Sequence, residues 1–352
     1  MMIAATRDDS TTHEDGMFWL RPDLDRTALG GAGWLDTALF DIDGVLIDTT
    51  GSYRRSVIAA TDALVRITGG FSDAPEPLVT PDDVEHFKLA GGFNSDWDLT
   101  QALVALWTAR LREWRGTPLA ERALAEWADD AASATRAGAG SLTWLRRVAP
   151  ASAIPDWDDA RWTHDEFYWG AAMLRDLHGR APRYTPDAPG LRQFERLLLT
   201  PETLTSLAAL GLEKYGLITG RVSPEVEWAL RMLAPDGEAA AVVGAHGPEA
   251  HPPFGVIVPA SLYTKPDPLA LAHALRMLDA RAAIYAGDTS DDLDLVLRYR
   301  AERLGDGAPS TLAVSVASGA AVETFRQRGA DITISSVSEL PDALIALRER
   351  LA

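Results

Sequence analysis

The stretch FDIDGVLIDTT, residues 40–50, places three aspartates directly behind a short apolar run. The run TALF (37–40) has the composition of a strand that is buried in a parallel sheet. Asp41 and Asp43 would then lie at the carboxyl end of that strand, where nearby carboxylates repel and raise each other's pKa. Other groups in the sequence must therefore compensate these two charges.

Several later stretches have the same character as residues 37–40. Apolar runs, the last expected to add an edge strand, lie at 215–219, 239–244, 282–287, 311–316 and 331–334. Stretches with the spacing of amphipathic helices alternate with them, at 223–233, 268–278 and 320–329. Because alternating strands and helices form βαβ units, we expect an α/β fold with a Rossmann-like parallel sheet core and helices on both faces.

The region from residue 51 to residue 200 differs, because it contains no convincing strand pattern. The apolar residues of 99–114 share one helical face, and 119–132 repeats the pattern with Leu124 and Trp127. Eight of the eleven tryptophans lie between residues 97 and 169. We interpret them as the interior of a helical domain, with stacking on a sugar or base as the alternative for one or two of them.

These patterns divide the chain into three parts. We expect a flexible N-terminal tail over 1–28, a catalytic core over 29–50 and 200–352, and an inserted all-helical domain over 51–199. A length of 352 residues also favours two folding units over one.

Composition narrows the class of partner. The net charge of −18 argues against a nucleic-acid partner and against binding to a membrane surface. No apolar run approaches the roughly 18 residues that a membrane span needs, and the polar N-terminus lacks the layout of a secretion signal. The absence of cysteine excludes thiol catalysis and zinc–thiolate sites and fits a cytoplasmic protein. The oligomeric state is left open.

The strand ends collect groups of complementary chemistry. Ligands of open parallel sheets bind beyond the carboxyl ends of the strands. Those ends, and the loop before the strand at 282–287, carry Asp41, Asp43, Thr219, Gly220, Arg221, Lys265, Asp288, Asp291 and Asp292. A hard cation such as Mg²⁺ binds carboxylates together with phosphate oxygens, and a carboxylate can act as a nucleophile. The pattern therefore predicts a magnesium and phosphate site.

Four motifs carry a resemblance to a known family. DIDGVLID (41–48), LITGR (217–221), KPDP (265–268) and GDTSDD (287–292) resemble the motifs of the haloacid dehalogenase superfamily, in order and at sensible spacing. The helical insert resembles the C1 cap of subfamily I, the phosphoglycolate-phosphatase-like branch, although it is larger than the usual cap. The resemblance implies an enzyme that acts on a small phosphorylated metabolite.

The resemblance also implies roles for single residues. Asp41 would be the nucleophile and Asp43 the general acid and base, while Thr219 and Lys265 would bind the phosphoryl group. Mg²⁺ would be held by Asp41, the backbone carbonyl of Asp43, Asp288 and Asp292. Asp291 and Asp292 would orient water or Lys265, with Asp292 as the one that also touches the metal. Asp43 favours a phosphatase or a phosphomutase over a dehalogenase or phosphonatase, and hydrolysis is the commoner outcome. A non-catalytic regulator is the further alternative, although no motif position is lost.

Substrate recognition is expected to involve further residues. The substrate-binding residues expected from the sequence are Gly44, Gly220, Arg221, Arg54, Arg55 and Asn94. For Arg54 and Arg55 the alternative is a solvated helix face, and for Asn94 a helix–helix turn. Asp48 is interpreted as the cap of a turn or helix and Asp294 as a helix-surface residue. His246 and His251 are interpreted as surface-loop residues.

Overall fold

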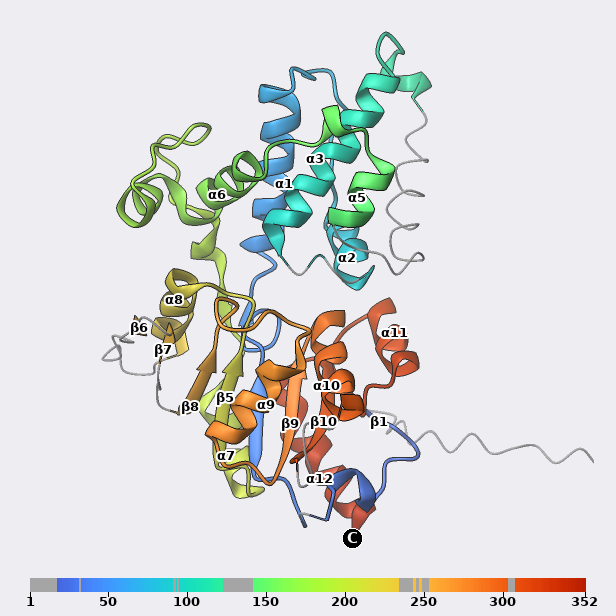
Figure 1. The fold of residues 1–352 in the computed structure, drawn as a ribbon, viewed down its shortest axis with the longest axis vertical. Coiled ribbons are helices and arrows are strands. Elements are labelled where there is room, and N and C mark those ends of the chain that lie inside the picture. Colours follow the sequence, from blue (N-terminus) through green and yellow to red (C-terminus); the bar gives the residue numbers. More distant parts are fainter. Residues whose placement is uncertain are drawn as a thin grey trace, which may run out of the picture. The chain divides into compact units, whose positions relative to one another are not determined.

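A computed structural model describes residues 18–31, 33–90, 93, 95–122, 142–233, 243–244, 247–248, 253–302 and 308–352. Their contacts divide the chain into two compact units, which we call the core and the helical unit (Figure 1). The core consists of the residues up to Ile47, Leu197–Asp288 and Asp292–Ala352. The helical unit consists of Asp48–Arg196 together with Thr289–Asp291.

The core is built on a seven-stranded sheet with the order β1-β11-β10-β9-β2-β5-β8. In that order the strands are Phe18–Leu20, Ile332–Ile334, Ser310–Val316, Ala282–Gly287, Thr37–Phe40, Lys214–Ile218 and Phe254–Val258. Every neighbouring pair is parallel except β1 and β11, which are antiparallel. The expected Rossmann-like parallel sheet is confirmed.

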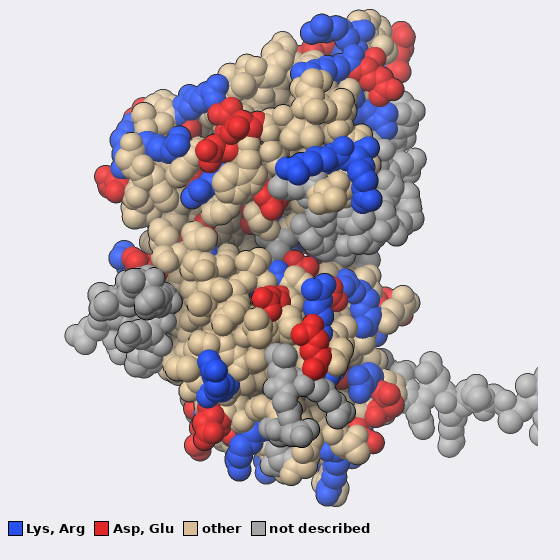
Figure 2. Space-filling view, in the orientation of Figure 1, with Lys and Arg blue, Asp and Glu red and all other residues tan. Residues whose placement is uncertain are grey.

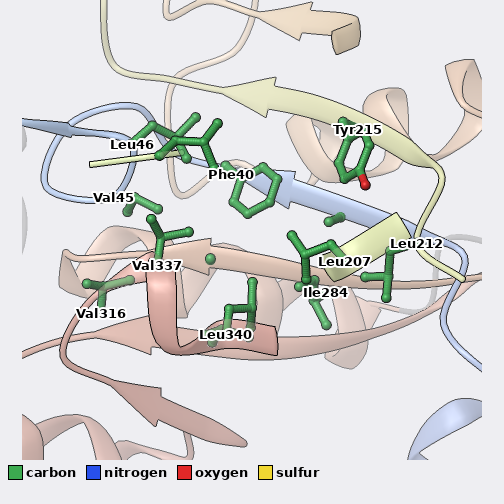
Figure 3. Packing of buried hydrophobic residues seen from close by; sticks show 14 of the residues in the cluster. Phe40, Val45, Leu46, Leu207, Leu212, Tyr215, Ile284, Val316, Val337 and Leu340 are labelled. Atoms are coloured by element: carbon green, nitrogen blue, oxygen red, sulfur yellow. The ribbon is translucent and has the colours of Figure 1, made fainter. Parts of the chain in front are cut away.

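Helices follow the strands and cover both faces of this sheet. They are α7 (Pro201–Ala209), α8 (Ser223–Leu233), α9 (Pro268–Met277), α10 (Ser290–Glu302), α11 (Ala320–Arg328) and α12 (Leu340–Leu351). Figure 3 shows Phe40 and Ile284 of the sheet beside Leu207 of α7 and Leu340 of α12. Side chains alternate between the faces of a strand, so Tyr285 points to the opposite face. It contacts α10 there.

Two strands of the core depart from the sequence-based expectation. Residues 18–20, expected within a flexible tail, form β1 at the edge of the sheet, so 331–334 is not an edge strand. β8 (Phe254–Val258), which the sequence pattern missed, pairs with β5 at the other edge. Of the predicted strand 239–244, only Val243–Gly244 lies within the described residues. It forms β6 of a separate two-stranded sheet with β7 (Gly247–Pro248).

The helical unit has an interior of its own. Its helices are α1 (Tyr53–Ala63), which continues as a π-helix to Thr68, α2 (Pro81–Ala90), α3 (Asp96–Glu113), α5 (Leu142–Val148) and α6 (Trp157–His178). Trp107, Trp114 and Trp144 belong to its buried cluster, as expected, whereas Trp127 lies outside the described residues. The chain passes between the units at β3 (Ile47–Asp48) and β4 (Arg196–Leu197), which pair with each other.

A second group of tryptophans surrounds one arginine of α6. The Arg161 guanidinium lies 4.7 Å from the ring centroid of Trp97 and 4.5 Å from that of Trp162. Trp97 also donates from Nε1 to a carboxylate oxygen of Asp165 at 2.7 Å. Cation–π contacts and a satisfied indole N–H thus hold these rings within the helical unit.

The charged surface is mixed. Figure 2 shows Lys and Arg side chains interspersed with Asp and Glu, and the described part of the face drawn carries no continuous basic surface. None of the described helices is long and apolar enough to cross a membrane.

Asp36, directly before β2, holds three strands together at their amino ends. Its side chain, 8% exposed, accepts hydrogen bonds from Lys214 Nζ and Arg281 Nε, both at 3.1 Å. It also accepts from the backbone N–H of Arg281 and the hydroxyl of Thr37. Burial alone would raise the pKa of Asp36, but these donors hold it below its usual value.

We expect Asp36→Asn to lower the free energy of unfolding by about 2 kcal/mol at neutral pH. The reason is that a neutral amide loses the ion pairs with Lys214 and Arg281. The native pKa lies below the unfolded value, so this contribution is present above the unfolded pKa and is lost as the pH falls. The difference between wild type and variant should shrink by about 1 kcal/mol between about pH 5 and about pH 3. Urea denaturation measures it, and a difference independent of pH would contradict the assignment.

Candidate active site

The register of the sheet brings the predicted residues together. Phe40, the last residue of β2, pairs with Leu217 of β5 and with Ala286 of β9. Asp41, Thr219 and Asp288 follow these strands within one or two residues of the paired positions. The three residues therefore lie together beyond the carboxyl ends of these strands.

The loop after β2 turns tightly around a glycine. The carbonyl of Ile42 accepts hydrogen bonds from the N–H groups of Leu46 at 2.9 Å and Ile47 at 3.0 Å. Gly44 has φ +70°, which favours glycine. A Cβ on Gly44 would lie 2.0 Å from Oδ2 of Asp288. Gly44 thus allows the loop to approach the Asp288 carboxylate, a contact that differs from the substrate-binding role expected for this glycine.

A buried lysine links two of the carboxylates. Lys265 Nζ lies 2.9 Å from Oδ2 of Asp41 and 2.7 Å from Oδ1 of Asp292. All three side chains are buried. Such a triad is stable only because the ammonium balances part of the negative charge.

Tyr285 completes this cluster and was not predicted from the sequence. Its hydroxyl lies 2.6 Å from Oδ1 of Asp292 and 3.3 Å from the backbone carbonyl of Ile218. Tyr285 therefore joins the end of β5 to the carboxylate that pairs with Lys265. A phenol in the otherwise apolar run AAIYAG, three residues before Asp288, was the available signal.

Burial and mutual repulsion shape the electrostatics of the cluster. Burial raises the pKa of Asp41 to about 7; Lys265 opposes this shift, whereas Asp292 and Asp43 add to it. Burial alone would lower the pKa of Lys265, but Asp292 and Asp41 raise it above its usual value. The lysine thus stays charged, and the ionised form of Asp41 needs further positive charge.

The acidic residues fit a divalent cation. Asp41, Asp288 and Asp292 offer oxygens that lie within 4.8 Å of one another. Oδ1 of Asp41 is buried, and no described residue donates a hydrogen bond to it. Carboxylate oxygens with this spacing suit a hard cation, which would supply the missing charge.

The two polar side chains of the LITGR motif, Thr219 and Arg221, have different partners. Thr219 is buried, and its hydroxyl accepts a hydrogen bond from the backbone N–H of Arg221 at 3.1 Å. Gly220 is exposed. The Arg221 guanidinium contacts Asp43 Oδ1 through Nε at 3.0 Å and Nη2 at 2.7 Å, and its expected role in substrate binding stays a prediction.

The two arginines expected to bind substrate from the insert have partners within the helical unit. Arg54 Nη2 lies 2.7 Å from Oε2 of Glu85, and the Arg55 guanidinium lies 5.1 Å from the ring centroid of Phe194. Their substrate-binding role stays a prediction. Asn94, His246 and His251 lie outside the described residues.

The remaining acids of the motifs have identifiable positions. Asp48 Oδ1 accepts the N–H and the hydroxyl of Thr50, so its interpretation as a turn cap is confirmed. Asp294, on α10, pairs with Arg328 of α11 at 2.8 Å, in agreement with a helix-surface role. Asp291 is buried in the first turn of α10.

We expect Gly44→Ala to weaken the binding of a divalent cation by about tenfold or more, because the new Cβ displaces the Asp288 carboxylate. Gly31→Ala is the matched control: Gly31 also has a positive φ, but a Cβ there meets nothing within 4 Å. Isothermal titration with Mg²⁺ measures both variants. Equal affinities in the two variants would rule out the proposed crowding at Asp288.

One solved structure shares this fold, and a second gives a weaker match. The phosphatase Tt82 from Thermococcus thioreducens is 22% identical, with a TM-score of 0.52 over 87% of this chain and 98% of that one. CbbY from Rhodobacter sphaeroides, solved in complex with phosphate, is 17% identical, with a TM-score of 0.42 over 87% and 96% of the two chains. At these identities the likeness to Tt82 supports the fold alone.

Sequence comparison finds a short match to one curated protein and a long match to a family model. Imidazoleglycerol-phosphate dehydratase of Phytophthora nicotianae is 39% identical over 66 residues, which are 19% of this chain and 12% of that protein. The chain therefore spans only a small part of this curated relative. The model of the haloacid dehalogenase-like hydrolases matches residues 35–295, a range that contains all four motifs and the cluster around Lys265. The chain belongs to the haloacid dehalogenase-like hydrolase family.

Proposed function

We propose that the protein is a Mg²⁺-dependent phosphatase that hydrolyses a small-molecule phosphomonoester through an aspartyl-phosphate on Asp41. The observation that carries this proposal is the cluster of Asp41, Lys265, Asp288 and Asp292. It combines a buried carboxylate with one oxygen to which none of the described residues donates, an ammonium at 2.9 Å and two further acids. This set suits attack on a phosphoryl group whose charge must be offset.

In the first step an oxygen of Asp41 attacks phosphorus. The bond between phosphorus and the ester oxygen breaks, and its electron pair stays on that oxygen. Asp43, two residues away, gives the oxygen a proton, so an alcohol leaves and a phosphate remains on Asp41.

In the second step water attacks the aspartyl-phosphate. Asp43 accepts a proton from that water, and the bond between phosphorus and the Asp41 oxygen breaks. Inorganic phosphate leaves, and Asp41 is again a carboxylate.

The other residues bind and balance charge. Thr219 and Lys265 hold phosphoryl oxygens, and Gly220 and Gly44 keep the neighbouring backbone close. When bound, Mg²⁺ held by Asp41, the backbone carbonyl of Asp43, Asp288 and Asp292 neutralises these acids and the phosphoryl oxygens.

The helical insert over 51–199 is proposed to act as the cap that selects the substrate, a small phosphorylated metabolite. Arg54, Arg55 and Asn94 are its candidate contacts. We place the enzyme in the cytoplasm, which agrees with a chain that contains no cysteine.

A panel of phosphate esters tests this proposal. It contains sugar phosphates, phosphoglycolate, nucleotides, pyrophosphate, histidinol phosphate and p-nitrophenyl phosphate. The name of the curated relative adds imidazoleglycerol phosphate. We expect phosphate release that needs Mg²⁺, stops with chelator and falls by a factor of about 10³ or more in Asp41→Asn, because the nucleophile is lost.

Asp294→Asn is the matched control, because it makes the same chemical change at an acid of α10 that pairs with Arg328 of α11. It should keep turnover close to that of wild type. Release that survives Asp41→Asn would overturn the mechanism. Transfer of phosphate to a second hydroxyl of the substrate, with no release, would identify a phosphomutase instead.

A further inference from the structure

Arg221 contacts the proposed acid and base with an unusual geometry. Two of its N–H groups, on Nε and Nη2, donate to the same oxygen, Oδ1 of Asp43. The described residues place no hydrogen-bond donor on Oδ2 of Asp43. The guanidinium therefore fixes one carboxylate oxygen and leaves the other available.

The position of the guanidinium is itself fixed by the core. Its side chain is 1% exposed, whereas that of Asp43 is 28% exposed. Nη1 donates to the backbone carbonyl of Glu225 in α8 at 3.2 Å. The Arg221 backbone carbonyl accepts the N–H of Ala260 at 3.2 Å, just after β8. Arg221 is thus held by two rigid elements before it contacts Asp43.

Arg221 also lies next to the residue proposed to bind phosphate. Its backbone N–H donates to the hydroxyl of Thr219. One residue therefore sets the direction of the Thr219 hydroxyl through its backbone and the direction of the Asp43 carboxylate through its side chain. Because the guanidinium contacts Asp43, this geometry favours a role for Arg221 through Asp43 over the direct substrate contact expected from the sequence.

We propose that Arg221 is a positioning residue that orients Asp43, so that Oδ2 carries the proton to the leaving oxygen. This inference rests on the proposed phosphatase function. The loss of activity on replacing Arg221 should then be larger for esters whose leaving group needs that proton more. An aliphatic alkoxide is a poor leaving group without protonation, whereas nitrophenolate leaves readily without it.

The test compares two esters in the full-length protein. The ratio kcat/KM reports only the steps up to departure of the alcohol, so slow hydrolysis of the aspartyl-phosphate does not obscure it. We expect Arg221→Gln to lower kcat/KM by about 10²-fold or more for the best aliphatic ester of the panel, but by less than about tenfold for p-nitrophenyl phosphate. Equal losses on the two esters, or no loss, would overturn the proposal.

A double-mutant cycle separates positioning from structural damage. Because Arg221 acts through Asp43, Asp43→Asn combined with Arg221→Gln should lose no more aliphatic-ester turnover than Asp43→Asn alone. Additive losses would show that Arg221 acts independently of Asp43. Arg221→Lys keeps the charge but loses the two-pronged contact, so it should show the same selective loss, and it serves if the glutamine variant does not fold.

Arg300→Gln is the control for removing an arginine from a carboxylate. Arg300 pairs with the buried Asp331 and donates to the backbone carbonyl of Thr311 at the amino end of β10, whereas the candidate site lies beyond the carboxyl ends of the strands. Arg300→Gln should lower the stability of the protein without changing the ratio of the kcat/KM values for the two esters. If wild type turns over neither ester, the phosphatase proposal fails first, and this outcome is distinct from wild-type activity with an unselective Arg221 variant.

Discussion

Several carboxylates are buried together beyond the carboxyl ends of the strands, and their negative charge must be balanced. The rest of the core depends on this constraint. Asp41 and Asp292 share a single ammonium, that of Lys265. Because burial makes each uncompensated charge expensive, the lysine must be buried with them and cannot be replaced by solvent. One ammonium cannot balance both Asp41 and Asp292, and the negative charge that remains is the physical reason why this end of the sheet suits a cation and a phosphoryl group.

The parallel sheet makes this compensation possible by register. Adjacent parallel strands that end at one level deliver residues that are far apart in sequence to one place. β2 lies between β5 and β9, so Asp41 is flanked by the ends of both. Close approach then depends on small details: Gly44 gives Asp288 room, and Tyr285 ties Asp292 to the end of β5.

The sequence was sufficient for features that follow from local order. The motif residues Asp41, Thr219, Lys265 and Asp288 could be placed because each follows a strand pattern or its loop. β8 was missed because FGVIV follows two prolines and contains a glycine, which mask a strand pattern. The contacts of Tyr285 and Arg221 were beyond prediction because they depend on side-chain direction across strands, which composition and spacing do not encode.

Asp41 and Asp43 show how position alone can give two identical residues different chemistry. Asp41 is buried against an ammonium and two further acids, so its charge depends on what binds beside it. Asp43 is partly exposed and bound on one oxygen by a fixed guanidinium. A nucleophile needs an oxygen that is held close to phosphorus, whereas an acid and base needs an oxygen that solvent and the leaving group can both reach. The two environments suit the roles proposed for Asp41 and Asp43, and these roles would account for two like charges placed two residues apart.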